Sequence, residues 1–170
     1  MEEIAEAAGL AVGTLYNYFP SKTDIAFELF QQSTATAIER GNEFLAQHPS
    51  DPAEALTELI LVYLRAFAAQ DRALWREAAR ALLAAPEDRP NLDLDLQVIG
   101  QVAELLRGLQ AKSQVAAELD PGRGAVTLYA LLISWYAAFS EWEHLSEADM
   151  ASEVRSTIQL LTHGLLPRSA

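Results

Sequence analysis

The stretch AVGTLYNYFPSK, residues 11–22, gathers two tyrosines and a phenylalanine in a short segment whose single charged residue is Lys22. Leu15 and Phe19 are four residues apart, which places both on one face of a helix. The side chains between them then point outward or sideways. The stretch therefore predicts a short helix over 12–18 that buries one side and exposes polar and aromatic groups.

The flanking residues predict a helix on each side of this one. A first short helix over 2–8 is expected to end at Gly9, the residue type that most easily takes the left-handed conformation beyond a helix end. Ser21 is expected to cap a long helix that runs to about residue 47. Asp24 lies three residues further on, where its carboxylate can reach back to the Ser21 N–H in a capping box.

The rest of the chain also predicts helices. Among the 170 residues 51% are hydrophobic and 21% charged, and apolar residues recur at three- and four-residue spacings without strand-like alternation. The expected helices span 52–69, 71–85, 92–115, 122–143 and 148–166, with a polar break at 86–90. The first of them carries an apolar stripe formed by Leu56, Leu59, Ile60, Tyr63, Leu64 and Phe67.

The last two helices differ from the others in their apolar patterns. The helix over 122–143 has a heptad stripe of Ala125, Leu128, Leu132, Trp135, Phe139 and Trp142, and beside it a second stripe of Val126, Tyr129, Ile133 and Tyr136. The final helix has a stripe of Met150, Val154, Ile158, Leu161 and Leu165. We expect a homodimer in which 122–143 and 148–166 form a four-helix bundle with a second copy. The alternative is that both stripes close an internal core.

Two short helices joined by a tight glycine-containing turn form a helix-turn-helix, in which the second helix enters the major groove of DNA. Gly13 lets the backbone approach, Thr14 offers a hydroxyl and a methyl, and Asn17 can pair with adenine through two hydrogen bonds. Tyrosine hydroxyls can donate to phosphates. The candidate DNA-binding residues are Val12, Gly13, Thr14, Tyr16, Asn17, Tyr18 and Lys22.

The segment IAEAAGLAVGTLYNYFPSKTDIAFELF, residues 4–30, resembles the DNA-binding region of the TetR family of bacterial transcriptional repressors. The matching residues are Ile4-Ala5, Ala8-Gly9-Leu10, Gly13-Thr14-Leu15-Tyr16, Tyr18-Phe19 and Ser21-Lys22. The resemblance implies an all-α protein with a helix-turn-helix in residues 1–30 and a helical ligand-binding and dimerisation domain in 31–170. It also implies repression that a small molecule relieves.

The resemblance assigns roles to single residues as well. It implies that Thr14, Tyr16, Tyr18 and Lys22 touch phosphates or bases of operator DNA. Val12, Gly13 and Asn17 would be their neighbours on the base side. No cofactor is implied.

Two departures from the family pattern concern the helix-turn-helix. Ala11 stands where the family usually has a serine or threonine that caps the recognition helix. The family also has a helix before the position of Ile4, so we expect a truncated helix-turn-helix. Residues 1–30 contain five acidic side chains and one lysine, so we expect weak DNA binding that roughly 20–30 upstream residues would restore.

Aromatic residues on several helices predict an apolar ligand pocket in the second domain. The candidate pocket residues are Tyr63, Phe67, Trp75, Trp135, Tyr136 and Phe139. Apolar pockets in helical proteins are lined in this way. The alternative is an ordinary aromatic core, since aromatic side chains dominate cores in any case.

Composition excludes several other classes of protein. There is no cysteine, which excludes disulfides and thiolate sites and is compatible with the cytoplasm. No apolar run is long enough for a membrane span.

Glu141 and His144 have the spacing of a di-iron ligand pair, but such a site needs a second pair, so we expect no metal and no enzyme. The net charge of −12 keeps open a helical ligand-binding or dimerisation protein that does not bind DNA.

Overall fold

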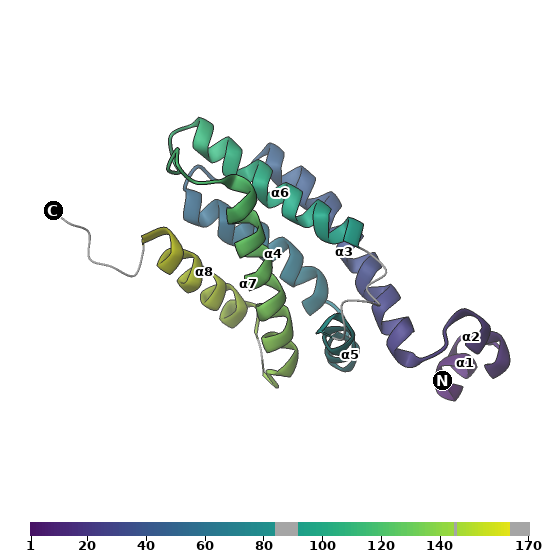
Figure 1. Ribbon diagram of the computed structural model, residues 1–170. Helices are drawn as coiled ribbons and strands as arrows, with labels where there is room; N and C mark the ends of the chain where they lie inside the picture. The colour runs from purple at the N-terminus through teal and green to yellow at the C-terminus, as the bar shows by residue number, and fades with distance from the viewer. Residues whose placement is uncertain (84–91, 145, 164–170) are drawn as a thin grey trace.

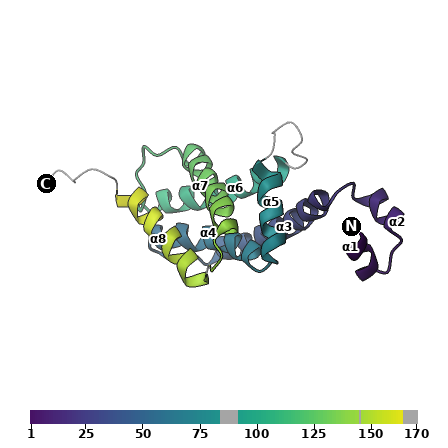
Figure 2. The same ribbon diagram turned by 90° about the horizontal axis from the view of Figure 1, so that it is seen from below.

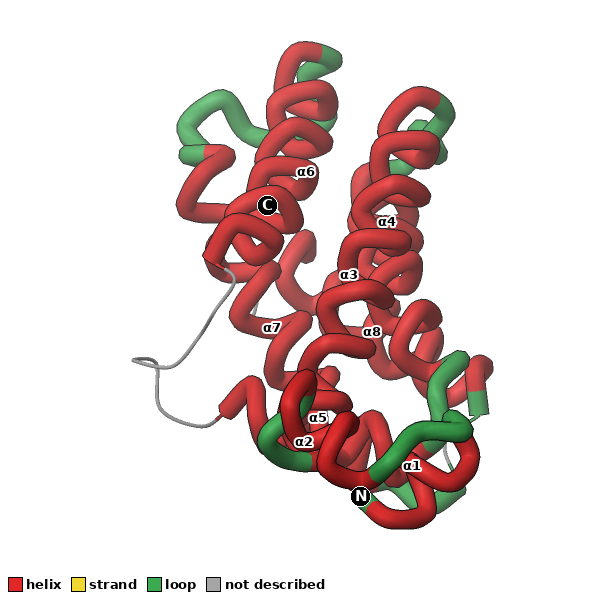
Figure 3. Tube along the Cα trace, turned by 90° about the vertical axis from the view of Figure 1, so that its right-hand side faces the viewer, coloured by secondary structure: helices red, strands yellow, loops and turns green. Residues whose placement is uncertain are grey.

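The computed structural model describes residues 1–83, 92–144 and 146–163, and this part of the chain contains eight helices and no strand. The helices are α1 (Glu2–Ala7), α2 (Val12–Tyr18), α3 (Lys22–Ala46), α4 (Pro52–Ala68), α5 (Arg72–Leu83), α6 (Leu92–Ala111), α7 (Pro121–Glu141) and α8 (Glu147–His163). Figures 1 and 3 show only helices and the loops between them. The prediction of an all-α protein is confirmed.

Helix α4 lies at the centre of a helical bundle, and α1 and α2 lie outside it (Figure 1). Helices α3 and α6 run side by side along one flank of α4, and α7 packs on α6. Helix α8 packs on α4 at the end of the molecule away from α1 and α2. The view from below shows the same separation, with α3 as the connection between the first two helices and the bundle (Figure 2).

The apolar stripe of α4 forms the middle of the core, as its spacing predicts. Its six side chains are each at most 6% exposed: Leu56, Leu59, Ile60, Tyr63, Leu64 and Phe67. Fully burying a leucine or phenylalanine side chain stabilises a fold by about 1.5–3 kcal/mol. The bundle is therefore held mainly by the burial of this helix among its neighbours.

The ends of the first helices follow the local signals closely. Gly9 has φ of +67°, and the Leu10 N–H donates to Ala5 O while the Gly9 N–H donates to Glu6 O, which is a Schellman end. Ser21 caps α3 by accepting the Asp24 N–H at 3.2 Å. The reciprocal contact differs from the prediction, because the Asp24 carboxylate accepts the Ser21 hydroxyl, at 2.6 Å, rather than its N–H.

Helix α6 ends at Ala111, four residues before the predicted end at 115, so that boundary is wrong. Ser113 takes a left-handed conformation with φ of 57°, and the Gln114 N–H donates to Leu109 O at 2.9 Å. This is again a Schellman end, with serine in place of the usual glycine. Because serine is not a strong signal for this conformation, the sequence pattern continued past the true end.

Several other boundaries among the described residues shift by one or two residues, as helix ends commonly do. Helix α7 begins at Pro121 and ends at Glu141, and α8 begins at Glu147. The predicted break at 86–90 and the last stripe residue, Leu165, lie outside the described residues.

A buried polar junction joins α3, α4 and α6. The Gln101 amide on α6 donates to Ile38 O and to Asn42 Oδ1 on α3, both at 2.7 Å, and accepts the Tyr63 hydroxyl from α4. Gln101 is 5% exposed and Tyr63 is 1% exposed. At Gly41, α3 and α6 approach each other so closely that a β-carbon on this residue would collide with Gln101 Oε1. The junction therefore sets the position of α3 along the bundle.

Candidate nucleic-acid interface and cavities

Helix α2 buries one side and exposes the rest. Leu15 is 5% exposed and packs inward, and Phe19 at the end of the helix is half-buried. Tyr16 and Tyr18 are 49% and 73% exposed, although both are large aromatic residues. Exposed aromatic groups of this size on a short helix are available for contact with another molecule.

The seven candidate DNA-binding residues lie along one short path from the start of α2 to the first turn of α3. Five are exposed, namely Gly13, Tyr16, Asn17, Tyr18 and Lys22, and two are half-buried, namely Val12 and Thr14. Figures 1 and 2 show that α2 lies at the far end of the molecule, where the bundle does not cover it. The structure thus brings together polar and aromatic groups that can reach a duplex.

The start of α2 lacks a side-chain cap, because its N-cap residue is Ala11. The Ala11 carbonyl accepts the Leu15 N–H at 3.2 Å, so this bond reports whether the first turn is formed. We expect Ala11→Ser to stabilise α2 by about 1 kcal/mol through a new hydrogen bond to a free N–H. Amide exchange of Leu15 should slow by about fivefold.

A serine at an exposed position in the last turn of another helix is the control for Ala11→Ser. Ala138→Ser in α7 should be neutral or slightly destabilising, because serine is a poorer helix former than alanine. Unchanged or faster exchange at Leu15 in Ala11→Ser would show that the first turn is not limited by its cap.

The first turn of α3 is tied to α5. The Thr23 hydroxyl donates to Glu77 Oε1 at 2.6 Å. Helix α5 is tied in turn to the end of α7, where Arg72 donates to the Phe139 carbonyl and Arg76 lies 3.4 Å from Glu141. A displacement of α5 against α7 would therefore also move the first turn of α3, which follows α2 in the chain.

Three of the six predicted pocket residues meet in an aromatic cluster, which we define as Phe30, Phe67, Trp75 and Tyr136. The ring centroids of Phe30 and Phe67 are 4.9 Å apart, those of Phe67 and Tyr136 are 4.5 Å apart, and those of Trp75 and Tyr136 are 5.7 Å apart. The rings fill the space between α3, α4, α5 and α7 and leave a cavity of about 10 Å³. Burial raises the pKa of the Tyr136 hydroxyl, which keeps it neutral.

The other three predicted pocket residues lie elsewhere. Tyr63 belongs to the polar junction with Gln101. Phe139 packs against Trp142 with ring centroids 5.1 Å apart, and Trp135 is half-buried at the edge of the core. The six residues therefore do not line one common cavity, because three of the rings fill the aromatic cluster and the other three lie in different contacts between helices.

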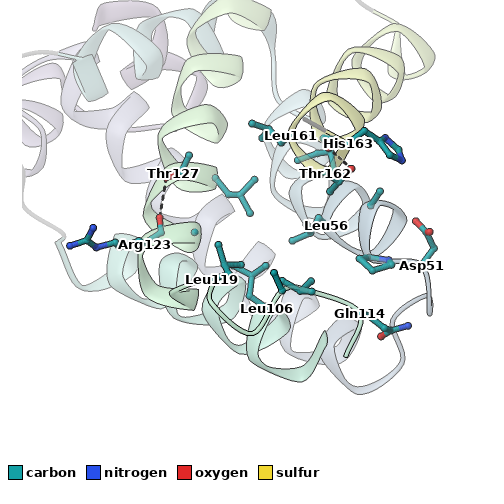
Figure 4. A pocket seen from close by; sticks show the side chains of 17 residues that line it. Asp51, Leu56, Leu106, Gln114, Leu119, Arg123, Thr127, Leu161, Thr162 and His163 are labelled. Carbon is teal, nitrogen blue, oxygen red and sulfur yellow. Dashed lines mark hydrogen bonds between the residues drawn. The ribbon is translucent and has the colours of Figure 1, made fainter. Parts of the chain in front are cut away.

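A further cavity lies between the first half of α7 and the second half of α8. Its volume is about 630 Å³. Figure 1 shows that α7 and α8 are close where they are connected and diverge toward the other ends, and Figure 4 shows the cavity in this opening. Sequence patterns did not predict it, because it arises from the angle between two helices.

Neither a membrane-spanning helix nor a metal-ligand cluster occurs in the part of the chain that the structure describes. No helix there is both long and apolar enough to cross a bilayer. No group of three histidine, aspartate or glutamate side chains there could hold a metal ion, and this includes the surroundings of Glu141 and His144.

Comparison with known proteins gives matches over both parts of the chain. The model of the family described as bacterial regulatory proteins, tetR family, matches residues 1–29. The transcriptional regulator AcrR of Shigella flexneri is 33% identical over 70 residues, which are 41% of this chain and 33% of AcrR. The chain thus spans about a third of the length of that relative.

Two further proteins match nearly the whole chain. The transcriptional repressor KstR of Rhodococcus jostii (strain RHA1) is 27% identical over 165 residues, which are 95% of this chain and 72% of KstR. The crystal structure of Thermus thermophilus FadR, a TetR-family repressor in complex with lauroyl-CoA, superposes with a TM-score of 0.69 at 26% identity, covering 99% of this chain and 85% of FadR. Proteins of this family are regulators that bind DNA, not enzymes. The fold, the exposed second helix and these matches together show that the chain is similar to the TetR family of bacterial regulatory proteins.

Proposed function

We propose that this protein is a ligand-responsive transcriptional repressor that binds operator DNA through residues 12–22. The observation that carries the proposal is the exposed face of α2, where Tyr16 and Tyr18 are 49% and 73% exposed while Leu15 is buried. A helix that buries its apolar side and exposes the other can enter the major groove while the apolar side stays packed. KstR and FadR, both described as transcriptional repressors, support this function.

The roles within this surface follow from the chemistry of each side chain. Thr14, Tyr16, Tyr18 and Lys22 would bind phosphates, which fixes the position of the helix on the duplex. Val12, Gly13 and Asn17 would lie toward the bases, where the asparagine amide can pair with adenine.

We propose that residues 1–30 act as the DNA-binding part and that 31–170 hold the effector and the dimer contacts. Because bacterial DNA is cytoplasmic, the protein would act there.

The exposed apolar side chains on α7 and α8 support a homodimer through 122–143 and 148–166. They are Val126 at 54%, Trp142 at 42%, Leu160 at 49% and Leu161 at 50% exposed. A two-fold dimer would place its recognition helices about 34–36 Å apart, one turn of DNA.

We propose that a small molecule relieves repression by opening the aromatic cluster. The cluster joins α3, α4, α5 and α7 and has almost no free volume, so an apolar group that entered it would separate these helices. Because Thr23 on α3 is bonded to Glu77 on α5, this separation would shift the start of α3 and with it α2. The lauroyl-CoA bound by FadR supports an effector of acyl type.

The DNA-reading role is tested by selecting binding sites from a pool of random duplexes. We expect the unmodified chain to enrich one sequence, and Asn17→Ala to lose the preference at one A·T pair, at a cost of about 1–3 kcal/mol. Tyr18→Phe, which removes only a phosphate donor, should weaken binding to all sequences equally. If no sequence is enriched and binding does not saturate, the alternative function holds, that of a helical ligand-binding or dimerisation protein.

A further inference from the structure

A cavity of about 370 Å³ lies where the end of α4, the start of α5 and the start of α8 meet. Ala68 of α4, Trp75 of α5 and Met150 of α8 contribute apolar surface to it, and the last two are 3% and 1% exposed. The volume lies within the range of roughly 300–1,000 Å³ that small-molecule sites occupy. The cavity is therefore large enough for a small molecule with an apolar part.

This cavity is distinct from the surface that supports the homodimer. That surface consists of exposed apolar side chains, none of which lines the cavity: Val126, Trp142, Leu160 and Leu161. Among the described residues that line it, none belongs to α7, and the two from α8, Glu147 and Met150, come from its first turn. A homodimer through the exposed apolar side chains therefore does not use this cavity.

Most polar side chains around the cavity are already bonded to other residues of the chain. The Arg65 guanidinium donates to Glu147 Oε1 at 2.7 Å and to Glu58 Oε2 at 3.0 Å, so two carboxylates offset its charge. Two further polar side chains of the lining also donate to neighbours, Gln70 to Ser33 and Ser146 to Asp149. These groups are therefore engaged within the protein.

Arg72 and Trp75 are the exceptions in the lining. Arg72 donates to the Phe139 carbonyl, which leaves further guanidinium N–H groups, and it pairs with no carboxylate among the described residues. Its guanidinium carbon lies 5.5 Å from the centroid of the Trp75 ring. Trp75 Nε1 is buried and has no hydrogen-bond partner, although buried N–H groups are rarely left without an acceptor.

The two available groups are both hydrogen-bond donors, and one of them carries a positive charge. A carboxylate matches this combination, because it is a pure acceptor whose two oxygens fit the fork of a guanidinium. The chain as a whole has a net charge of −12, so it does not attract anions in general. Affinity for a carboxylate would therefore depend on these two side chains.

We propose that this cavity binds a monocarboxylate with a short apolar tail. The carboxylate would accept from Arg72 and from Trp75 Nε1, and the tail would lie against Ala68 and Met150. This second ligand site goes beyond the proposed function and is tested by direct binding. Its failure would therefore leave operator binding untouched, and a failure of operator binding would leave this site untouched.

Calorimetric titration of the full chain with octanoate and octanamide tests the ligand class. The two compounds have the same tail and nearly the same shape, but only octanoate is charged. We expect saturable binding of octanoate and about tenfold weaker binding of octanamide, because hydrogen bonds to charged groups are the stronger ones. Equal binding of the two would overturn the proposed chemistry, and no binding of octanoate would overturn the site.

Two arginines of α5 provide matched variants for the charge. Arg72 and Arg76 are both half-buried and both tie α5 to the end of α7, but only Arg72 lines the cavity. We expect Arg72→Gln to weaken octanoate binding by more than tenfold and Arg76→Gln to leave it unchanged. If both substitutions weaken it equally, the loss comes from a loosened α5 rather than from a lost contact, and the proposal is wrong.

Two exposed alanines provide matched variants for the position of the tail. Ala68 lines the cavity, whereas Ala73 on α5 does not. Ala68→Trp should weaken octanoate binding by more than tenfold, and Ala73→Trp should not change it. Trp75→Phe keeps a ring but removes Nε1, so it should weaken octanoate about fivefold. Unchanged binding in Trp75→Phe would overturn the role assigned to Nε1.

Glu147→Gln is expected to tighten octanoate binding roughly two- to fivefold. The substitution removes the one carboxylate of the lining and leaves Arg65 with Glu58 alone. A gain in affinity is a result that damage to the fold would not produce. Weaker binding in this variant would show that the positive charge of the cavity does not hold the ligand, which contradicts the proposal.

Other occupants would give different results in the same experiments. If octanoate enters the aromatic cluster instead, Ala68→Trp will bind it as tightly as the unmodified chain, which overturns the proposal. If a second copy covers the cavity, saturating octanoate will compete with it. Sedimentation will then show that a dimer dissociates, and this also overturns the proposal. Circular dichroism of each variant establishes that it is folded.

Discussion

Lys22→Glu is expected to lower the affinity for duplex DNA by roughly 100-fold at low salt. Lys22 is exposed in the first turn of α3, and it is the only base among five acids in residues 1–30. A phosphate there would meet the ammonium and the free N–H groups of the helix start together. Reversing this charge in each half of a symmetric dimer lowers the binding free energy by about 1.4 kcal/mol per half. Each loss weakens the affinity about tenfold, so the two together weaken it about 100-fold.

The measurement is a salt titration of binding to the duplex that the unmodified chain selects from the random pool. In Lys22→Glu the slope of log affinity against log salt should become less steep by about one unit for each lost contact. The chain offers a close control, because its only other lysine, Lys112, is exposed in the turn after α6. Lys112→Glu should change neither affinity nor slope. Equal effects of the two substitutions would show that only net charge matters.

Gly41→Leu is expected to lower the free energy of unfolding by about 3–5 kcal/mol. Even a β-carbon at Gly41 would collide with Gln101 Oε1, and a whole side chain would force α3 and α6 apart. Gln101 would then lose its bonds to Ile38 and Tyr63, and the Tyr63 hydroxyl, on a residue that is 1% exposed, would be left without a partner.

Urea denaturation followed by circular dichroism measures this effect. Gly100→Leu is the matched control, because Gly100 is exposed in α6 next to Gln101 and a β-carbon there meets no atom within 4 Å. That change should be neutral or stabilising by up to about 1 kcal/mol, since leucine is a better helix former than glycine. If both variants unfold at the same urea concentration, the close approach of α3 and α6 does not hold the bundle together.

The residues near α2 could be interpreted from the sequence because their signals are local. The end of α1 at Gly9 and the start of α3 at Ser21 are made by hydrogen bonds between residues at most five positions apart, and both appear in the structure as expected. The four-residue spacing of Leu15 and Phe19 is enough to predict that both side chains lie on the inward face of the helix. The helix end at Ser113 was missed because serine rarely takes the left-handed conformation that it has there.

The candidate pocket shows where such interpretation ends. Aromatic spacing placed Phe67, Trp75 and Tyr136 on inward helix faces, and these three do meet. Spacing carried no information on whether rings from different helices would enclose a space or fill it. Tyr63 illustrates the same point, because its partner Gln101 lies 38 positions away on another helix.

By itself the sequence determined the helical class of the protein, the position of the short helix over 12–18 and the side chains that this helix exposes. These depend on interactions between residues a few positions apart, which spacing and residue type record directly. Only the tertiary structure decided that Gln101 locks α3 to α4 and α6, that the aromatic cluster is nearly full, and that α7 and α8 diverge over a cavity of about 630 Å³. Those features depend on angles and distances between helices, which arise when side chains distant in sequence pack against one another.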